Sequence, residues 1–128
     1  MNPLRSSLLV HVTQIDQEHV ELALIANRLA DSTNRADMLL IAQELLDKTR
    51  AHFATEESLM QRHEYAGMDS HVAIHRDLLR QADRMLEQLT ADTISPTELA
   101  QFLKAWLHNH ISGTDQFLGY YLRLRGVT

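Results

Sequence analysis

Hydrophobic residues recur along this chain at steps of three and four, the spacing that gives an α-helix one apolar face. Short polar or glycine-containing turns interrupt that spacing three times. The pattern predicts four helices, which run from about Ser7 to Asp31, from Arg35 to His63, from Asp69 or Ser70 to Leu89, and from Pro96, after a cap at Ser95, into the C-terminal region. Because short turns make neighbouring helices antiparallel, we expect an all-α, up-down-up-down four-helix bundle.

Length and composition narrow the kind of protein. The chain has 128 residues, enough for one hydrophobic core, so residues 1–128 are expected to form a single domain. Its net charge of -5, with charges of both signs interspersed, argues against a nucleic-acid partner. No apolar run reaches the roughly 18 to 20 residues of a membrane span, and no N-terminal leader pattern occurs. We therefore expect a cytoplasmic protein without a membrane partner.

Several side chains that can bind metal fall inside the apolar stripes. His19 lies in the stripe of the first predicted helix, which points it into the core. Residues four apart on a helix lie on one face, about 5 to 6 Å from each other. His52 and Glu56 form one such pair, and His71 and His75 form another.

His110 and Asp115 extend this set, although a spacing of five does not fit a regular helix and would rotate the two side chains about 140° apart. Gly113 lies between them and lowers the regularity of the helix. We therefore expect a π-type turn there, which would bring both side chains to one face. The helical rise, measured from the turns, places both residues at the same level along the bundle axis as His19, His52, Glu56, His71 and His75.

Seven potential ligands at one depth predict a metal site with two ions. Burying five imidazoles and two carboxylates without a strong partner would cost more than a marginally stable domain tolerates. The chain contains no cysteine, so disulfides and thiolate ligands are excluded and the metals must take imidazole and carboxylate.

The order of these residues resembles that of bacterial hemerythrins. The matching segments are Ile15 to His19 (IDQEH), His52 to Met60 (HFATEESLM) and Trp106 to Ile111 (WLHNHI). The resemblance covers nearly the whole chain and implies a hemerythrin-like bundle with a non-haem di-iron centre that binds dioxygen reversibly at one iron. It also implies the role of each ligand: His71, His75 and His110 on one iron, His19 and His52 on the other, and Glu56 and Asp115 as bridges.

Counting donors supports an open position independently of the family. Five imidazoles, two bridging carboxylates and one bridging oxide or hydroxide fill about eleven of the twelve sites of two octahedral irons. The open site is expected beside His19 and His52. Neutral imidazoles favour holding dioxygen over cleaving it, unlike carboxylate-rich sites built on Glu-x-x-His motifs, which this chain lacks. Leu107 resembles the family's pocket leucine that shields dioxygen, although ordinary core packing also explains it.

Other notable side chains have simpler interpretations. His108 lies two positions from His110, on the wrong face, and is expected to be exposed. His63 is expected to be a solvated histidine near a helix end, and Trp106 a packing residue. Glu57 is expected to face solvent or to hydrogen-bond a ligand histidine.

The sequence predicts the metal site in more detail than the function of the protein. The favoured function is an oxygen- or redox-sensing domain of a signalling protein, whose iron state controls an attached output domain or a partner. A freestanding oxygen carrier or storage protein is the alternative. A third, less favoured alternative is an enzyme that acts on peroxide or nitric oxide at the same irons. The sequence therefore leaves enzymatic activity open. Dioxygen is the expected ligand, with small anions or nitric oxide as further candidates.

Overall fold

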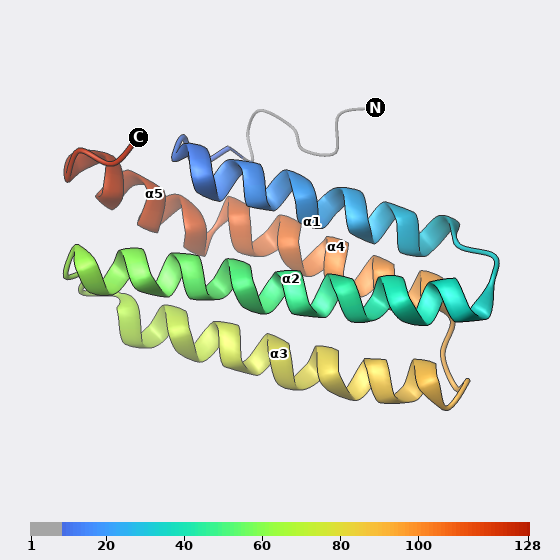
Figure 1. The fold of residues 1–128 in the computed structure, drawn as a ribbon. Helices are drawn as coiled ribbons and strands as arrows, with labels where there is room; N and C mark the ends of the chain where they lie inside the picture. Colours follow the sequence, from blue (N-terminus) through green and yellow to red (C-terminus); the bar gives the residue numbers. More distant parts are fainter. Residues whose placement is uncertain (1–8) are drawn as a thin grey trace.

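Five α-helices make up the structure, a computed structural model that describes residues 9–128. They are α1 (Thr13–Asp31), α2 (Arg35–Arg62), α3 (Met68–Thr90), α4 (Pro96–Ser112) and α5 (Thr114–Leu124). The first four alternate in direction, and α1 and α3 each contact both α2 and α4 (Figure 1). α5 continues beyond α4 at the end of the bundle that also holds the α2 to α3 turn (Figure 1). The predicted all-α bundle is confirmed.

Two of the helix starts follow from capping residues that the sequence displays. Asn34 accepts a hydrogen bond from the N–H of Asp37 at the start of α2, and Ser95 accepts one from the N–H of Glu98 at the start of α4. Each cap satisfies a backbone donor that the first helical turn leaves without a partner. α3 begins at Met68 without a side-chain cap, slightly earlier than predicted.

The first helix begins later than the sequence predicts. The expected start at Ser7 lies outside the described residues, and residues 9–12 form a non-helical segment before α1. Within it Val10 is fully buried, and its N–H donates to Asp16 Oδ1 at 2.8 Å. A Cβ atom on Gly119 of α5 would lie 2.8 Å from Val10 Cβ, so this close approach requires glycine. The segment thus joins the start of α1 to α5.

A helix break at Gly113 replaces the expected π-type turn, so that prediction is wrong. Gly113 has φ −112° and ψ −90°, outside the helical region, and α5 starts anew at Thr114. The break places His110 and Asp115 on two separate helices. Because each residue lies on its own helix, the two side chains are not related by a single helical period. Both are buried.

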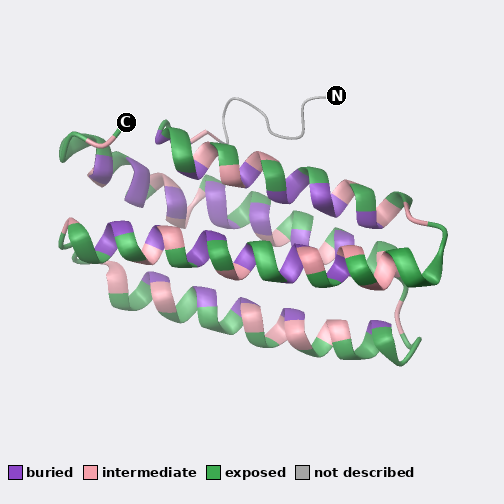
Figure 2. Ribbon diagram, in the orientation of Figure 1, coloured by how far each residue is buried: buried purple, intermediate pink, exposed green. Residues whose placement is uncertain are grey.

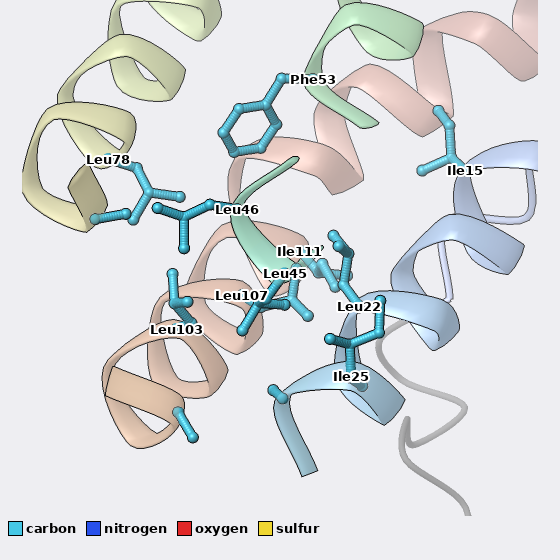
Figure 3. Packing of buried hydrophobic residues seen from close by; sticks show 14 of the residues in the cluster. Ile15, Leu22, Ile25, Leu45, Leu46, Phe53, Leu78, Leu103, Leu107 and Ile111 are labelled. Carbon is cyan, nitrogen blue, oxygen red and sulfur yellow. The ribbon is translucent and has the colours of Figure 1, made fainter. Parts of the chain in front are cut away.

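The core is a continuous apolar layer along the inner face of each helix (Figure 2). Leucine and isoleucine side chains from α1, α2, α3 and α4 converge in its middle (Figure 3). Among the described residues, the buried polar side chains are Thr49 and the seven predicted ligands. Within residues 9–128, none of the helices combines the length and the apolar character that a membrane span requires.

Candidate metal centre

The structure brings all seven predicted ligands together near the end of the bundle that carries α5. Their donor atoms form two overlapping groups, each with all atoms within 4.8 Å of one another. One group contains His19, His52, Glu56 and Asp115, and the other contains Glu56, His71, His75, His110 and Asp115. The two carboxylates belong to both groups. Every described helix supplies at least one of the seven side chains.

Glu56 divides its two oxygens between the histidine groups. Oε2 lies 2.9 Å from Nε2 of His52 and 3.5 Å from Nε2 of His19. Oε1 lies 3.0 Å from Nε2 of His75 and 3.2 Å from Nε2 of His71. One carboxylate therefore faces two separate sets of imidazole nitrogens.

Asp115 divides its oxygens in the same way. Oδ2 lies 3.2 Å from Nε2 of His19, whereas Oδ1 lies 2.9 Å from Nε2 of His110 and 3.0 Å from Nε2 of His71. Nε2 of His75 and Nε2 of His110 also face each other at 3.2 Å. Imidazole nitrogens and carboxylate oxygens that gather this closely are typical of groups that share a cation.

Many of these donor atoms lack a hydrogen bond. Both oxygens of Asp115, Oε2 of Glu56, and Nε2 of His19 and of His52 are buried without a hydrogen-bond partner among the described residues. They lie close to one another but are not aligned as donor and acceptor. Unpaired buried polar atoms are rare because each costs about 1 to 3 kcal/mol. The donor set of five imidazoles and two shared carboxylates fits a pair of iron ions, which would satisfy these atoms.

Two further carboxylates hydrogen-bond ligand histidines through the ring nitrogen that does not face the cluster. The Nδ1–H of His52 donates to Glu18 Oε1 at 2.8 Å, and the Nδ1–H of His75 donates to Glu57 Oε2 at 3.0 Å. Each bond selects the tautomer that leaves Nε2 free to bind a metal, and it fixes the direction of the ring. The sequence left two roles open for Glu57, facing solvent or hydrogen-bonding a ligand histidine. The structure shows the hydrogen bond.

Sequence reasoning assigned no role to Glu18, because its partner lies on another helix. Thirty-four residues separate Glu18 from His52, so no helical period relates them. The available signal was its position next to His19, combined with the antiparallel pairing of the first two helices. Thr55 also donates to Glu18, at 3.2 Å, and stabilises the carboxylate in this position.

Aromatic rings hold two histidines from the side. Phe53 stacks on His75 with ring centroids 3.7 Å apart and planes within 4° of parallel. Trp106 stacks on His110 at 4.3 Å and 20°. Trp106 is therefore a packing residue as expected, with a ligand histidine as its neighbour. These contacts limit rotation of the imidazoles and bury them in an apolar layer.

The electrostatics favour a cation at the centre. Burial opposes the charged form of His52, but the charge of Glu56 and the hydrogen bond to Glu18 raise the pKa of His52 to about 10. Burial likewise opposes the imidazolium of His71, but the neighbouring carboxylates of Asp115 and Glu56 raise its pKa to about 9. Burial disfavours the ionised form of Glu56, yet the charge of His52 lowers its pKa well below the ordinary value. Without a metal, protons on the imidazoles neutralise the carboxylates.

The remaining histidines of the described residues lie outside the cluster. His108 is exposed, as expected. His63 is the C-cap of α2 and is half-buried, and its carbonyl accepts a hydrogen bond from the hydroxyl of Tyr121. Leu107 is 9% exposed and lies one turn before His110, where it lines an apolar cavity with Phe53.

Comparison with known proteins agrees with this geometry. A family profile described as the Hemerythrin HHE cation binding domain matches residues 10–120. The chain belongs to the hemerythrin family. The family and the buried donor set together make it a hemerythrin-like di-iron-binding protein.

Hemerythrin relatives come from bacteria and from eukaryotes. The bacteriohemerythrin of Stenotrophomonas maltophilia (strain R551-3) is 30% identical over 115 residues, which is 88% of this chain and 75% of the relative. The hemerythrin-like protein of Naegleria gruberi is 32% identical over 110 residues, 86% of this chain and 84% of the relative. A crystal structure of wild-type hemerythrin matches with a TM-score of 0.80 at 28% identity, covering 87% of this chain and 88% of that one.

Proposed function

We propose that this hemerythrin binds dioxygen reversibly at its di-iron centre and serves as an oxygen- or redox-sensing domain. Dioxygen binding is supported by the unequal number of histidines on the two sides of the carboxylates. One side of the carboxylates faces three imidazoles, and the other side faces two. An octahedral ion on the two-histidine side therefore has one donor fewer and can accept an external ligand.

In this proposal each ligand has a role that follows from its contacts. His71, His75 and His110 would hold one iron, and His19 and His52 would hold the other. Glu56 and Asp115 would bridge the pair, because each directs one oxygen to one histidine group and its other oxygen to the second group. When bound, the iron pair would supply the two electrons that dioxygen accepts on binding and returns on release.

The protein's own groups control access and orientation. Leu107 and its apolar neighbours keep water and anions from the two-histidine side, which favours reversible binding over oxidation. Glu18 and Glu57 keep the Nδ1 protons of His52 and His75 in place, so that both rings present Nε2 to the metals.

The position of α5 supports a sensing role. Asp115 lies in its first turn, directly after the break at Gly113, so a change at the centre acts on a separate helix. α5 exposes Phe117 by 73%, Tyr120 by 60% and Leu124 by 68%. Exposed apolar side chains at steps of three and four offer a surface on which a shift of α5 can act on a partner or an attached domain.

Dioxygen binding is tested with the iron-loaded, diferrous protein. Mixing with dioxygen should produce a charge-transfer absorption that disappears when the gas is removed, over repeated cycles. Iron analysis should give about two ions per chain. Irreversible oxidation within the mixing time, even at low temperature, would contradict reversible binding and favour a redox sensor or an enzyme.

Sensing is tested separately by hydrogen exchange of residues 110–125 in the diferrous and diferric states. A sensor requires that the two states differ in the protection of α5, because only a difference between states can bias a partner. Identical protection together with reversible dioxygen binding would favour the carrier alternative.

A further inference from the structure

The last helix needs contacts of its own to hold Asp115 at the metal centre. The break at Gly113 separates α5 from α4, so the position of α4 does not fix the rotation of α5 about its axis. This rotation decides whether the carboxylate meets the histidines, because each residue along a helix turns by about 100°. Asp115 is 1% exposed, and its Oδ2 lies 3.2 Å from Nε2 of His19. Other contacts of α5 must therefore set this position.

The first set of contacts joins one flank of α5 to residues 9–12, which we call the strap. Nε2 of Gln116 donates to the carbonyl of Leu9 at 3.2 Å, and the guanidinium of Arg123 donates to the carbonyl of Val10. Gln116 and Arg123 are seven residues apart, about two helical turns, so they lie on the same flank of α5. The strap therefore holds this flank at two levels.

A second set of contacts joins the opposite flank of α5 to the end of α2. The hydroxyl of Tyr121 donates to the carbonyl of His63 and lies 3.3 Å from the carbonyl oxygen of Glu64. The helical period places Tyr121 about 120° from Asp115 on one side, and Arg123 about 80° from it on the other. The inner face that carries Asp115 is therefore held from both sides.

The strap is itself bound to α1, the helix that carries His19, and Figure 1 shows the start of α1 beside α5. The N–H groups of Val10 and His11 donate to the two carboxylate oxygens of Asp16, at 2.8 and 3.0 Å. Asp16 precedes His19 by three residues, about one turn of α1. The strap thus joins the two helices whose ligands, His19 and Asp115, face each other.

We propose that the strap and the hydroxyl of Tyr121 position the metal centre by holding Asp115 in the rotation that meets His19. Neither touches a metal, and both act through the carboxylate. Because coupling between two sites is reciprocal, a strap that strengthens metal binding is itself held more firmly when metal is bound. The inference rests on Asp115 as a metal ligand, and not on dioxygen binding or sensing.

Cobalt(II) is the probe, because it binds imidazole and carboxylate donors and its visible absorption reports its coordination. Arg123→Ala removes a contact with the strap and should lower the affinity for cobalt about tenfold, measured by competition with a chelator. Arg123→Lys can still donate to the carbonyl of Val10 and should restore most of the affinity. The control is Arg84→Ala, which alters an exposed arginine of α3 that has no hydrogen bond or ion pair among the described residues. Equal affinities in Arg123→Ala and Arg84→Ala would overturn the proposal.

A double-mutant cycle separates positioning from a general effect on the fold. Asp115→Ala removes the ligand, and the other six remain to bind cobalt. In this background Arg123→Ala has no carboxylate to displace, so it should cause little further loss of affinity. The same loss with and without Asp115 would mean that Arg123 supports the whole fold, and would overturn the proposal.

Tyr121→Phe tests the opposite flank of α5 and remains informative if Arg123→Ala does not fold. It removes only the hydroxyl that bonds to α2, and should lower the cobalt affinity about fivefold, the effect of one ordinary hydrogen bond. Tyr120→Phe is the matched control, because the Tyr120 side chain is 60% exposed and has no hydrogen bond among the described residues. Equal affinities in these two variants would overturn the role of Tyr121.

Hydrogen exchange measures the reciprocal effect on the strap. Loading the wild type with cobalt should slow exchange of the N–H groups of Val10 and His11, and the slowing should be smaller in Arg123→Ala. Unchanged exchange at both groups would overturn the coupling. None of these measurements involves dioxygen. Irreversible oxidation by dioxygen would contradict the proposed function and leave the strap in its role, whereas reversible binding by a protein with an uncoupled strap would do the reverse.

Discussion

Glu57 accepts a 3.0 Å hydrogen bond from Nδ1 of His75, and this bond leaves Nε2 of the same ring facing Glu56 and His110. A carboxylate in this position makes the imidazole a better donor to a metal, because it stabilises positive charge on the ring. The hydrogen bond therefore contributes to the strength of the site although Glu57 touches no metal.

Glu57→Gln should weaken metal binding without removing a ligand. Glutamine can still accept the hydrogen bond but carries no charge, so His75 becomes a poorer donor. We expect the affinity for ferrous iron to fall about tenfold, measured by competition with a chelator under anaerobic conditions. Glu87→Gln removes the same charge from an exposed position on α3 and is the control. Equal affinities in the two variants would exclude the role assigned to Glu57.

The two carboxylates that divide their oxygens should be needed for a coupled iron pair. Glu56→Gln and Asp115→Asn each remove the charge of one proposed bridge, so the oxidised proteins should lose antiferromagnetic coupling or one iron. His63→Ala and His108→Ala alter histidines outside the cluster and should retain two coupled irons. Magnetic susceptibility and iron analysis give the readout. Loss of iron from His63→Ala with retention in His19→Ala would mean that the ligand assignment is wrong.

The helical period predicts part of this site directly from the sequence. His52 and Glu56, like His71 and His75, share a face because they are four residues apart on one helix, and the structure places them as the period requires. Contacts between helices are different, because they depend on how each helix is rotated against its neighbour. The bond between Glu18 and His52 and the stacking of Phe53 on His75 are of that kind.

Local backbone geometry limits the prediction in another way. The spacing of His110 and Asp115 shows that the helix must be irregular between them, and Gly113 marks the place. It does not distinguish a widened turn from a complete break. The structure has the break, because glycine can leave helical geometry at little steric cost. The start of α1 is also set by local contacts. Residues 9–12 lie against α5 and are not helical, although the helical pattern predicted a helix there.

Leu107→Ala should hasten oxidation of the dioxygen-bound protein. Removing the side chain enlarges the cavity that Leu107 lines and should admit water and anions toward the metal centre. Truncation of a buried leucine also lowers the free energy of unfolding, by about 2 to 5 kcal/mol. Leu29→Ala, a fully buried leucine that does not line the cavity, controls for this loss. Equal oxidation rates in the two variants, followed by absorption spectroscopy, would remove Leu107 from the shielding layer.

Metal uptake should release protons and weaken as the pH falls. In the metal-free protein the pKa values of His52 and His71 are about 10 and 9, so both imidazoles carry a proton near pH 7 that the metal must displace. If both protons leave, the affinity should fall by about 100-fold for each unit decrease in pH. Chelator competition between pH 6 and 8 measures the slope, and an indicator dye measures the protons. Glu18→Gln should lower the pKa of His52 and reduce the release; unchanged affinity across the range would contradict the prediction.

Gly119→Ala should destabilise the protein, although alanine normally stabilises a helix relative to glycine by about 1 kcal/mol. The new Cβ would lie 2.8 Å from Cβ of Val10 and 2.9 Å from its carbonyl oxygen, so the segment before α1 must move. We expect a net loss of about 1 to 3 kcal/mol in the free energy of unfolding, measured by denaturant titration. A gain in stability would show that this close contact between the segment and α5 is absent in solution.

The break at Gly113 also determines where the chain tolerates a change of length. Each residue inserted between His110 and Asp115 would turn Asp115 by about 100° and withdraw it from the centre, because α5 would restart in a different rotation. The turns from α1 to α2 and from α3 to α4 lie at the opposite end of the bundle, away from the seven predicted ligands (Figure 1). Insertions there leave the ligand positions unchanged. New loops, tags or reporter peptides therefore belong at that far end, and the four residues from Ile111 to Thr114 must keep their number.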